Sequence, residues 1–233
     1  MSKARARNPQ PNRGLLITFE GNEGSGKSTQ IPLLAQRLRE LGFAVRALRE
    51  PGGTPIGEEI RHTLKHSQDN ASMTPEAELL LMNASRAQLV WEVIRPALAK
   101  GEIVLCDRFY DSTTAYQGYG RRLSLERVRA SIDLAVGSTR PDLTLLLEIP
   151  PGVSQGRLHK RRASAAPVRD RMEEADRDFF ARVDKGYQAI AAAEPKRVRR
   201  IDATGTVERV AARIWNIVDP VVRTRNRIGS NLK

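Results

Sequence analysis

The fold of this chain is decided by Leu15-Leu16-Ile17-Thr18-Phe19-Glu20-Gly21-Asn22-Glu23-Gly24-Ser25-Gly26-Lys27-Ser28. An apolar run leads directly into a complete G-x-x-x-x-G-K-[ST] sequence, and an amphipathic helical pattern begins at Thr29. Glycines in such a loop let backbone N–H groups turn inward around phosphate oxygens at the positive end of a helix. Lys27 can then reach the β- and γ-phosphates, and the Ser28 hydroxyl suits Mg²⁺. The stretch therefore predicts a strand, a phosphate loop and a helix that bind a nucleoside triphosphate.

Strand and helix patterns alternate along the rest of the chain. Short apolar runs predict strands over 15–20, 44–49, 103–106, 143–149 and 198–202, and helical patterns cover 29–41, 56–64, 74–96, 124–136, 177–193 and the residues after 206. Thr74 and Pro75 suit the N-cap and first position of the long helix, and Pro96 is expected to kink or end it. The alternation predicts an α/β fold with three α/β/α layers and a five-stranded parallel sheet.

Length and charge set the domain organisation. With 233 residues, one domain over 14–220 is expected, flanked by a disordered basic tail over 1–13 and a basic C-terminal tail over 221–233. The net charge of +12 could indicate nucleic acid, but each tail carries four basic residues and no acidic one, which leaves +4 on the body. A body that holds two polyanionic ligands accounts for that charge, so no nucleic-acid partner is expected.

Apolar content and cysteine usage predict the compartment. No apolar segment approaches the roughly 18 residues of a membrane span, and the basic N-terminus lacks the apolar core of a secretory signal. The single cysteine, Cys106, excludes an internal disulfide. We therefore expect no membrane association and a cytoplasmic protein.

Further polar motifs follow the predicted strands, at the edge where open α/β sheets bind ligands. Arg49-Glu50-Pro51-Gly52-Gly53-Thr54 follows the second strand, and Asp107-Arg108-Phe109-Tyr110-Asp111-Ser112 with Ala115-Tyr116-Gln117-Gly118 follows the third. Met82 and Arg86 lie one helical turn apart on one face of the long helix. Each motif alone could be a turn or a local ion pair. Together they predict a second ligand that meets the γ-phosphate of the donor.

These motifs, with Ala84-Ser85-Arg86, Asp170-Arg171-Met172-Glu173 and Ile201-Asp202-Ala203-Thr204, make the chain resemble the thymidylate kinase family from about Leu15 to Val218. The resemblance implies a P-loop kinase fold with a mobile lid at about 157–171, of the bacterial type. It also implies an enzyme that phosphorylates dTMP to dTDP with ATP and Mg²⁺, in dTTP biosynthesis. The family forms homodimers, so a homodimer is expected.

The resemblance also implies the residues of the donor site. ATP would be bound by Gly21, Asn22, Glu23, Gly24, Ser25, Gly26, Lys27, Ser28 and Thr29. Ser28 and Asp107 would hold Mg²⁺, and Arg108 would bridge the donor and acceptor phosphates. The lid would add Arg157, Arg161 and Arg171 around the transferring group. An Ala-Ala-Pro insertion leaves the choice between Arg161 and Arg162 open.

The acceptor residues follow from the same resemblance. Arg86 and Gln117 would bind thymine with Ser112 close by, Tyr116 would pack against the deoxyribose, and Glu23 would lie near its 3′-hydroxyl. Glu50 and Pro51 would lie near the acceptor phosphate. Met82 stands where the family usually has phenylalanine, which leaves the base tolerance open, and Glu148 stands where aspartate is common.

Two alternatives remain at this stage. The first is another nucleoside or nucleoside-monophosphate kinase, acting on dUMP, dGMP, AMP or a deoxynucleoside. The second is a P-loop ATPase that binds nucleic acid through the basic tails, although no DNA-contact motif is visible.

The bridging role implied for Arg108 predicts the effect of its removal. Arg108→Ala should lower kcat roughly 100- to 1,000-fold, because a charge contact made in the transition state is lost. Steady-state phosphoryl transfer measures this effect, and a near-normal kcat would contradict the bridging role.

Overall fold

Five parallel strands form one sheet in the order β2-β3-β1-β4-β5. Their bounds are β1 (Leu16–Glu20), β2 (Val45–Arg49), β3 (Ile103–Asp107), β4 (Leu143–Glu148) and β5 (Val198–Asp202). The computed structural model describes residues 13–150, 152–154, 156–157, 171–174 and 176–230. The predicted α/β class and five-stranded parallel sheet are confirmed, with strand ends shifted by no more than one residue.

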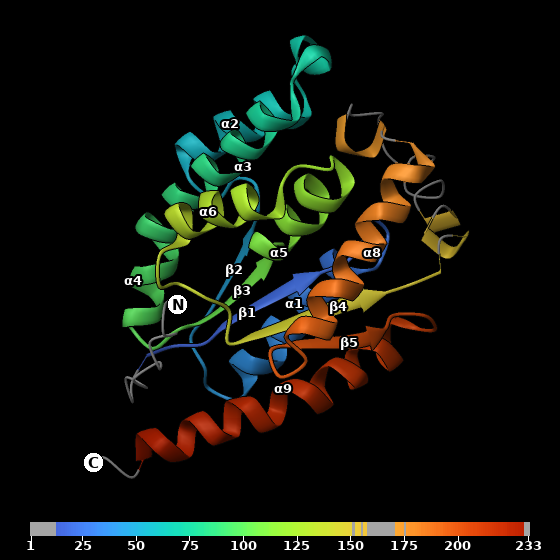
Figure 1. Cartoon of the computed structure of the whole chain (residues 1–233). Helices are drawn as coiled ribbons and strands as arrows, with labels where there is room; N and C mark the ends of the chain where they lie inside the picture. Colours follow the sequence, from blue (N-terminus) through green and yellow to red (C-terminus); the bar gives the residue numbers. More distant parts are fainter. Residues whose placement is uncertain (1–12, 151, 155, 158–170, 175, 231–233) are drawn as a thin grey trace.

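Helices cover both faces of the sheet (Figure 1). The α-helices are α1 (Lys27–Glu40), α2 (Pro55–Lys65), α3 (Pro75–Leu89), α4 (Arg95–Ala99), α5 (Tyr110–Thr113), α6 (Leu125–Val136), α8 (Arg177–Ala193) and α9 (Val207–Ser230). The described residues also form the 3₁₀ helices η1 (Gln68–Ser72) and η4 (Arg171–Glu174), and the π-helical turns η2 (Val90–Ile94) and η3 (Thr114–Gly120).

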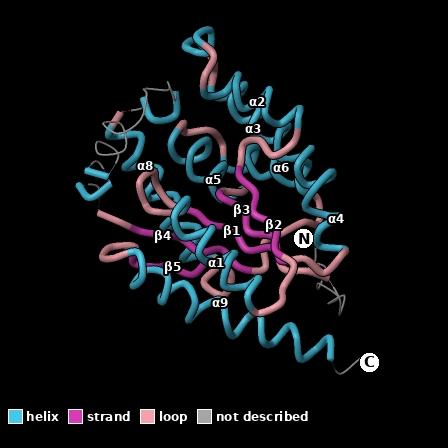
Figure 2. The backbone as a smooth tube through the Cα atoms, turned by 180° about the vertical axis from the view of Figure 1, so that it is seen from behind, coloured by secondary structure: helices cyan, strands magenta, loops and turns pink. Residues whose placement is uncertain are grey.

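Alternating strand residues divide the core into the predicted layers. Ile17 and Phe19 pack with α1 and α9 on one face of the sheet. Leu16, in contrast, packs with α3, α4 and α6 on the other face, and Leu146 packs there with η3 and α8. Figure 2 shows α1 and α9 together on their side of the strands. Because both faces are covered, the inner strands β1, β3 and β4 are mostly apolar, whereas the edge strands β2 and β5 also carry exposed charged side chains.

The long helical pattern does not stop at Pro96. After α3 the chain widens into the π-helical turn η2, and Pro96 then lies in the first turn of α4. Proline has no N–H to donate to a carbonyl oxygen of the preceding turn. The change of helix type just before Pro96 accommodates this missing hydrogen bond. Pro96 therefore coincides with a change of helix type and not with a helix end, and the helical run ends only at Ala99.

A helical segment that the sequence did not predict follows β3. Residues Tyr110–Gly120 form α5 and η3, and they carry the Ser112, Tyr116 and Gln117 side chains. This segment packs closely against α8. A Cβ atom at Gly186 would lie 2.9 Å from the Tyr119 ring, and one at Gly120 would lie 2.6 Å from Phe179. Glycine at these two positions therefore lets η3 and α8 approach each other.

The C-terminal segment also differs from the expectation of a tail that begins at 221. Helix α9 continues to Ser230, and Val222 is buried against the core formed with α1. The apolar spacing Val210, Ile214, Val218 and Val222 keeps one face of α9 on the sheet layer. The basic residues Arg223 and Arg225 therefore belong to a helix that packs on the body.

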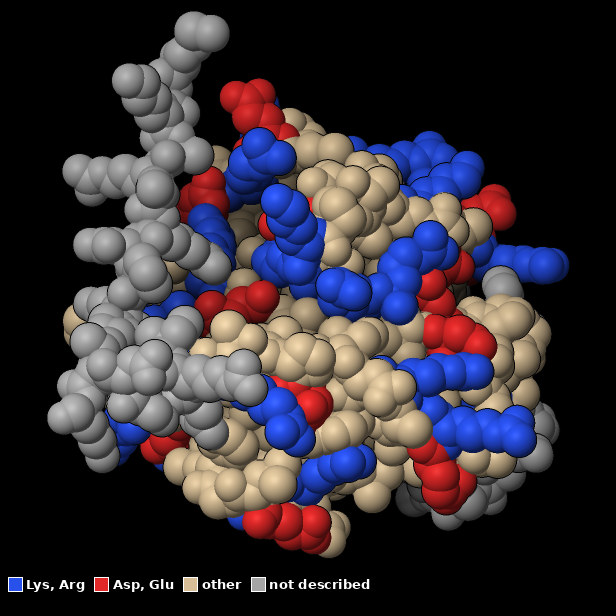
Figure 3. All heavy atoms as spheres, turned by 90° about the horizontal axis from the view of Figure 1, so that it is seen from below, with Lys and Arg blue, Asp and Glu red and all other residues tan. Residues whose placement is uncertain are grey.

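Basic side chains on the surface commonly have an acidic neighbour. Exposed ion pairs join Arg46 to Glu102 and Arg223 to Asp219. Figure 3 shows Lys and Arg side by side with Asp and Glu over the face seen from below. Nowhere in the described part of the chain does a helix combine the length and apolar composition that crossing a bilayer requires.

The packing of α9 predicts a stability difference within the basic C-terminal segment. Val222→Ala should lower the free energy of unfolding by about 2 kcal/mol, because a buried apolar side chain is lost and a cavity remains. Exposed Arg223→Ala is the matched control and should change it by about 0.5 kcal/mol or less. Urea denaturation of both variants measures the effect, and equal stabilities would contradict the packed helix.

Candidate active site

The phosphate loop lies between the carboxyl end of β1 and the first turn of α1. Gly21, Gly24 and Gly26 have φ angles of 127°, 74° and 96°, which favour glycine. At Gly21 a Cβ atom would lie 2.3 Å from the carbonyl oxygen of Leu147, so a side chain does not fit there. The sequence motif therefore forms the curved loop that phosphate binding requires.

Lys27 lies across this loop. Its ammonium donates to the carbonyl oxygens of Gly21 and Asn22, at 2.9 and 3.0 Å, and to the Ser25 hydroxyl at 3.3 Å. Burial, and then the nearby Arg108 charge, lower the pKa of Lys27 to about 8. The loop therefore holds a cation whose charge depends on pH in the mildly alkaline range.

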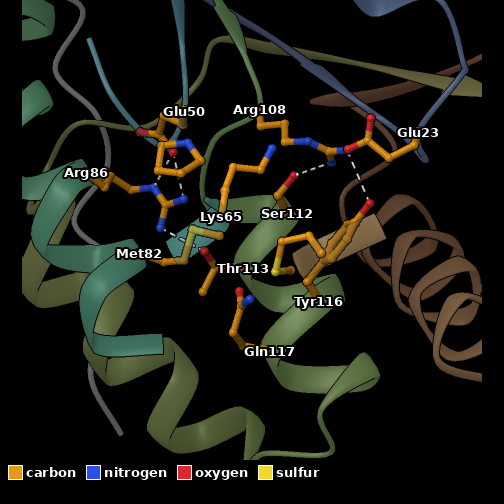
Figure 4. Close-up of a pocket in the computed structure, with 12 residues that line it drawn as sticks. Glu23, Glu50, Lys65, Met82, Arg86, Arg108, Ser112, Thr113, Tyr116 and Gln117 are labelled. Carbon is orange, nitrogen blue, oxygen red and sulfur yellow. Dashed lines mark hydrogen bonds and ion pairs between the residues drawn. The ribbon is translucent and has the colours of Figure 1, made fainter. Parts of the chain in front are cut away.

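Arg108 connects the loop to a neighbouring pocket. It follows β3 with a positive φ of 69°, and its guanidinium donates to Glu23 at 2.7 Å. It also donates to Ser112 at 3.1 Å and to the Tyr116 and Tyr187 hydroxyls at 3.2 Å. Although burial opposes it, the Arg108 charge holds the pKa of Glu23 well below its usual range. Figure 4 shows Arg108 reaching toward both Glu23 and Ser112.

Glu20 is a site residue that the sequence analysis missed. It is fully buried at the end of β1 and accepts hydrogen bonds from the Phe109 and Ser112 amides, at 2.8 and 3.3 Å. It also accepts from the Ser112 and Tyr187 hydroxyls, at 2.5 and 3.0 Å. Burial, and then the charge of Asp111, raise the pKa of Glu20 to about 7. A lone acid at the end of an apolar strand was the available signal.

The pocket beside Arg108 is lined by every predicted acceptor residue (Figure 4). Its walls are Glu23, Glu50, Pro51, Lys65, Met82, Arg86, Arg108, Ser112, Thr113, Tyr116, Gln117 and Met172. Met82 and Arg86 thus share one face of α3, as their spacing predicted. The sequence analysis missed Lys65 and Thr113, which lie outside the motifs quoted above, and Met172, which lies in a quoted motif but was given no role in the site. Lys65 ends α2 and adds a cation whose charge helps to lower the pKa of Glu23.

The Arg86 side chain makes more hydrogen bonds to the protein than a contact with the base of a nucleotide would require. It is 2 % exposed and donates from Nε to Glu50 at 2.8 Å. Its other nitrogens donate to Asn83 and Thr113, at 2.9 and 2.8 Å, and to the Phe109 carbonyl oxygen at 3.3 Å. The second oxygen of Glu50 has no hydrogen-bond partner among the described residues, and burial raises the pKa of this carboxyl. Arg86 therefore fixes the wall of the pocket.

Among the predicted lid residues, Arg171 has other neighbours than expected. Arg171 donates to Glu78 and to the carbonyl oxygen of Met73, so its guanidinium is engaged beside α3 instead of at the phosphate loop. Glu148 pairs with Arg200 on the surface. Arg161, like Arg162, lies outside the described residues. Arg157 does meet the loop, because it donates to the carbonyl oxygens of Gly24 and Ala203, both at 3.2 Å.

The start of α1 and the end of β3 offer two oxygen ligands for a cation, Ser28 and Asp107. Ser28 follows Lys27 in the first turn of α1, and the Asp107 charge acts on the Lys27 ammonium. The Asp107 carboxylate accepts no hydrogen bond from the described residues, and those residues contain no group of three or more His, Cys, Asp or Glu side chains that could hold a metal. Mg²⁺ commonly takes one or two protein oxygens together with phosphate oxygens. The residues present therefore fit Mg²⁺ bound with a nucleotide.

Comparison with known proteins gives one consistent result. A family model described as "Thymidylate kinase" matches residues 19–214. A thymidylate kinase from a Synechococcus strain is 50% identical over 206 residues, which cover 88% of this chain and 95% of the relative. The thymidylate kinase of Syntrophotalea carbinolica is 51% identical over 200 residues, covering 85% of this chain and 92% of the relative. The crystal structure of thymidylate kinase from Ehrlichia chaffeensis is similar with a TM-score of 0.70 and 30% identity, covering 89% of this chain and 99% of that one.

The lowered pKa of Lys27 predicts how triphosphate binding depends on pH. Only the protonated ammonium attracts phosphate, so affinity for ATP should be constant well below pH 8 and fall above it. The limiting slope is about tenfold per pH unit. Calorimetric titrations from pH 6.5 to 9.5 measure the effect. Lys27→Arg is the matched control, because its charge persists through this range; wild-type affinity that stays constant to pH 9.5 would contradict the prediction.

Proposed function

This chain belongs to the thymidylate kinase family, and from this premise we propose how its residues carry out the family's reaction. The enzyme is an ATP-dependent nucleoside-monophosphate kinase that transfers the γ-phosphoryl group of ATP to dTMP and forms dTDP. The observation that supports the residue assignment best is the position of Arg108. Its guanidinium contacts Glu23 of the phosphate loop and Ser112 and Tyr116 of the pocket, so one cation serves both sites.

At the donor end we assign the ATP phosphates to the loop Gly21–Thr29. Its amides and the Lys27 ammonium would bind phosphate oxygens, and the glycine conformations support this role. Ser28 and Asp107 would hold Mg²⁺. When bound, Mg²⁺ neutralises phosphate charge and orients the β- and γ-phosphates. Positioning and charge neutralisation account for most of the acceleration in such transfers, because the protein performs little covalent chemistry.

At the acceptor end we assign dTMP to the pocket beside Arg108. Gln117 and Met82 would contact thymine, with Arg86 fixing the wall beside it. Tyr116, whose hydroxyl accepts from Arg108, would lie against the deoxyribose, and Glu23 would lie near its 3′-hydroxyl. The acceptor phosphate would lie toward Arg108, with Ser112, Glu50 and Pro51 around it. The joint lining of one cavity by these residues supports the assignment.

The basic segment at about 157–171 is assigned to the donor side in part. Arg157 supports this role through its bonds to Gly24 and Ala203. For Arg161 the assignment rests on family resemblance alone. Arg171 would act on the donor only after leaving Glu78, so we assign it to the acceptor side instead.

We also propose one kinase domain, a homodimer and a cytoplasmic location. Exposed large apolar side chains support a self-association face: Leu80 on α3, Trp91 on η2 and Leu134 on α6 are 64 %, 70 % and 89 % exposed. Helices α3 and α6 lie against each other, which makes such a face continuous. A buried free thiol at Cys106 suits a reducing compartment.

An acceptor panel tests the function. Release of ADP from ATP should be fastest with dTMP, and slower by a wide margin with dCMP, dGMP and AMP. Equal turnover of any of these would contradict a thymidylate-specific site. DNA added without a monophosphate provides a second arm, and stimulation by DNA but not by dTMP would favour a nucleic-acid-dependent ATPase.

A further inference from the structure

Glu78 lies at the centre of a buried polar cluster, and the reaction described above gives this carboxylate no role. Its side chain is 0 % exposed in the first turn of α3. One oxygen accepts from the Gln117 amide nitrogen at 2.7 Å and from Arg121 Nε at 3.2 Å. The other accepts from Arg121 Nη2 at 3.0 Å and from Arg171 at 2.5 Å. Four donors from η3, its C-terminal cap and η4 thus converge on one carboxylate.

The chemistry of this carboxylate fixes the orientation of Gln117. Burial alone would raise the pKa of Glu78, but bonds and charges from Arg121, with Gln117 and Arg171, lower it. An ionised carboxylate only accepts hydrogen bonds. Gln117 must therefore direct its NH₂ group to Glu78, which leaves its carbonyl oxygen on the opposite side of the amide.

That oxygen is available to a ligand. Gln117 lines the pocket, and Figure 4 shows its amide end directed into the cavity between Thr113 and Tyr116. No described residue donates a hydrogen bond to the Gln117 oxygen. Arg86 on the opposite wall already directs its nitrogens to protein acceptors, and the Thr113 hydroxyl can rotate to donate to either kind of base. Gln117 thus presents an acceptor oxygen to the cavity, and its bond to Glu78 fixes that orientation.

We propose that Glu78 is a positioning residue that makes the pocket selective for a base with an N–H at ring position 3. This inference rests on the proposed function. Thymine carries a hydrogen on N3 and donates it, whereas N3 of cytosine only accepts. An acceptor oxygen held toward the base favours thymine and opposes the lone pair of cytosine. A site built around such a hydrogen bond can discriminate strongly, because the wrong base leaves buried polar groups unpaired.

Glu78→Gln tests the inference, since the surrounding donors determine how the new amide lies. Two arginine bonds, at 3.0 and 2.5 Å, reach the oxygen that faces Arg171, against one longer bond, from Arg121 Nε at 3.2 Å, to the other oxygen, so the amide oxygen takes the position that faces Arg171. The new NH₂ group then faces Gln117, which turns its own oxygen toward it and its NH₂ group into the cavity. The ratio of kcat/KM for dCMP to that for dTMP should rise about tenfold or more.

The matched control is Arg121→Gln. It removes a charge from Glu78 but leaves the Gln117 bond, so the dCMP-to-dTMP ratio should stay at the wild-type value. A merely structural Glu78 would lower both kcat/KM values together in Glu78→Gln, and that unchanged ratio would overturn the inference.

A second variant covers the case in which Glu78→Gln fails to fold because it leaves buried arginines without a counter-charge. Glu78→Gln/Arg121→Gln removes one cation together with the anion, and it retains the new NH₂ group facing Gln117. Its ratio should also rise about tenfold, and a wild-type ratio would overturn the inference. Wild-type turnover of dTMP is measured alongside: its absence would refute the proposed function itself, whereas wild-type turnover with unchanged variant ratios refutes only the role of Glu78.

Discussion

The arrangement of this molecule depends on one buried guanidinium, that of Arg108, between two sites for anions. A phosphoryl transfer brings two negatively charged nucleotides into contact, and their repulsion must be offset before chemistry can occur. Arg108 is held by Glu23 on the loop side and by Ser112, Tyr116 and Tyr187 on the pocket side. Because these partners come from different elements, the cation is fixed before either nucleotide arrives, and such preorganisation makes electrostatic stabilisation effective.

The same principle extends to the acidic residues around the pocket. Glu20 anchors the start of α5 through the Phe109 and Ser112 amides, Glu50 pairs with Arg86 on the pocket wall, and Glu78 pairs with Arg121. Buried ion pairs contribute little net stability, since desolvation offsets most of the attraction. Because these pairs are concentrated around one cavity, we infer that their role is to orient side chains: each carboxylate fixes the direction of a donor that matters to the ligand.

The sequence predicted the parts of the fold that rest on local patterns. The P-loop motif, the parallel strands and the helix limits at Thr74 and Ser124 follow from glycine, apolar runs and caps, and the structure agrees. The segment Tyr110–Gly120 was missed because its glycines and polar residues are typical of loops, and only close packing on α8 makes it helical. Tertiary packing likewise extends α9 past residue 221. Among site residues, Glu78 gave no signal, because an acid in the first turn of a helix is ordinarily solvated.

One short segment, the π-helical turn η3, carries side chains for both the base end and the phosphate end of the pocket. A π-helical turn is wider than an α-helical one, so the chain rotates less from one residue to the next. Two consecutive side chains, Tyr116 and Gln117, can then both face the cavity while they bond to different partners. Tyr116 accepts from Arg108 at the phosphate end, and Gln117 donates to Glu78 at the base end. Because Tyr116 and Gln117 are neighbours in η3, this one segment links the base end of the pocket to the phosphate-bridging cation.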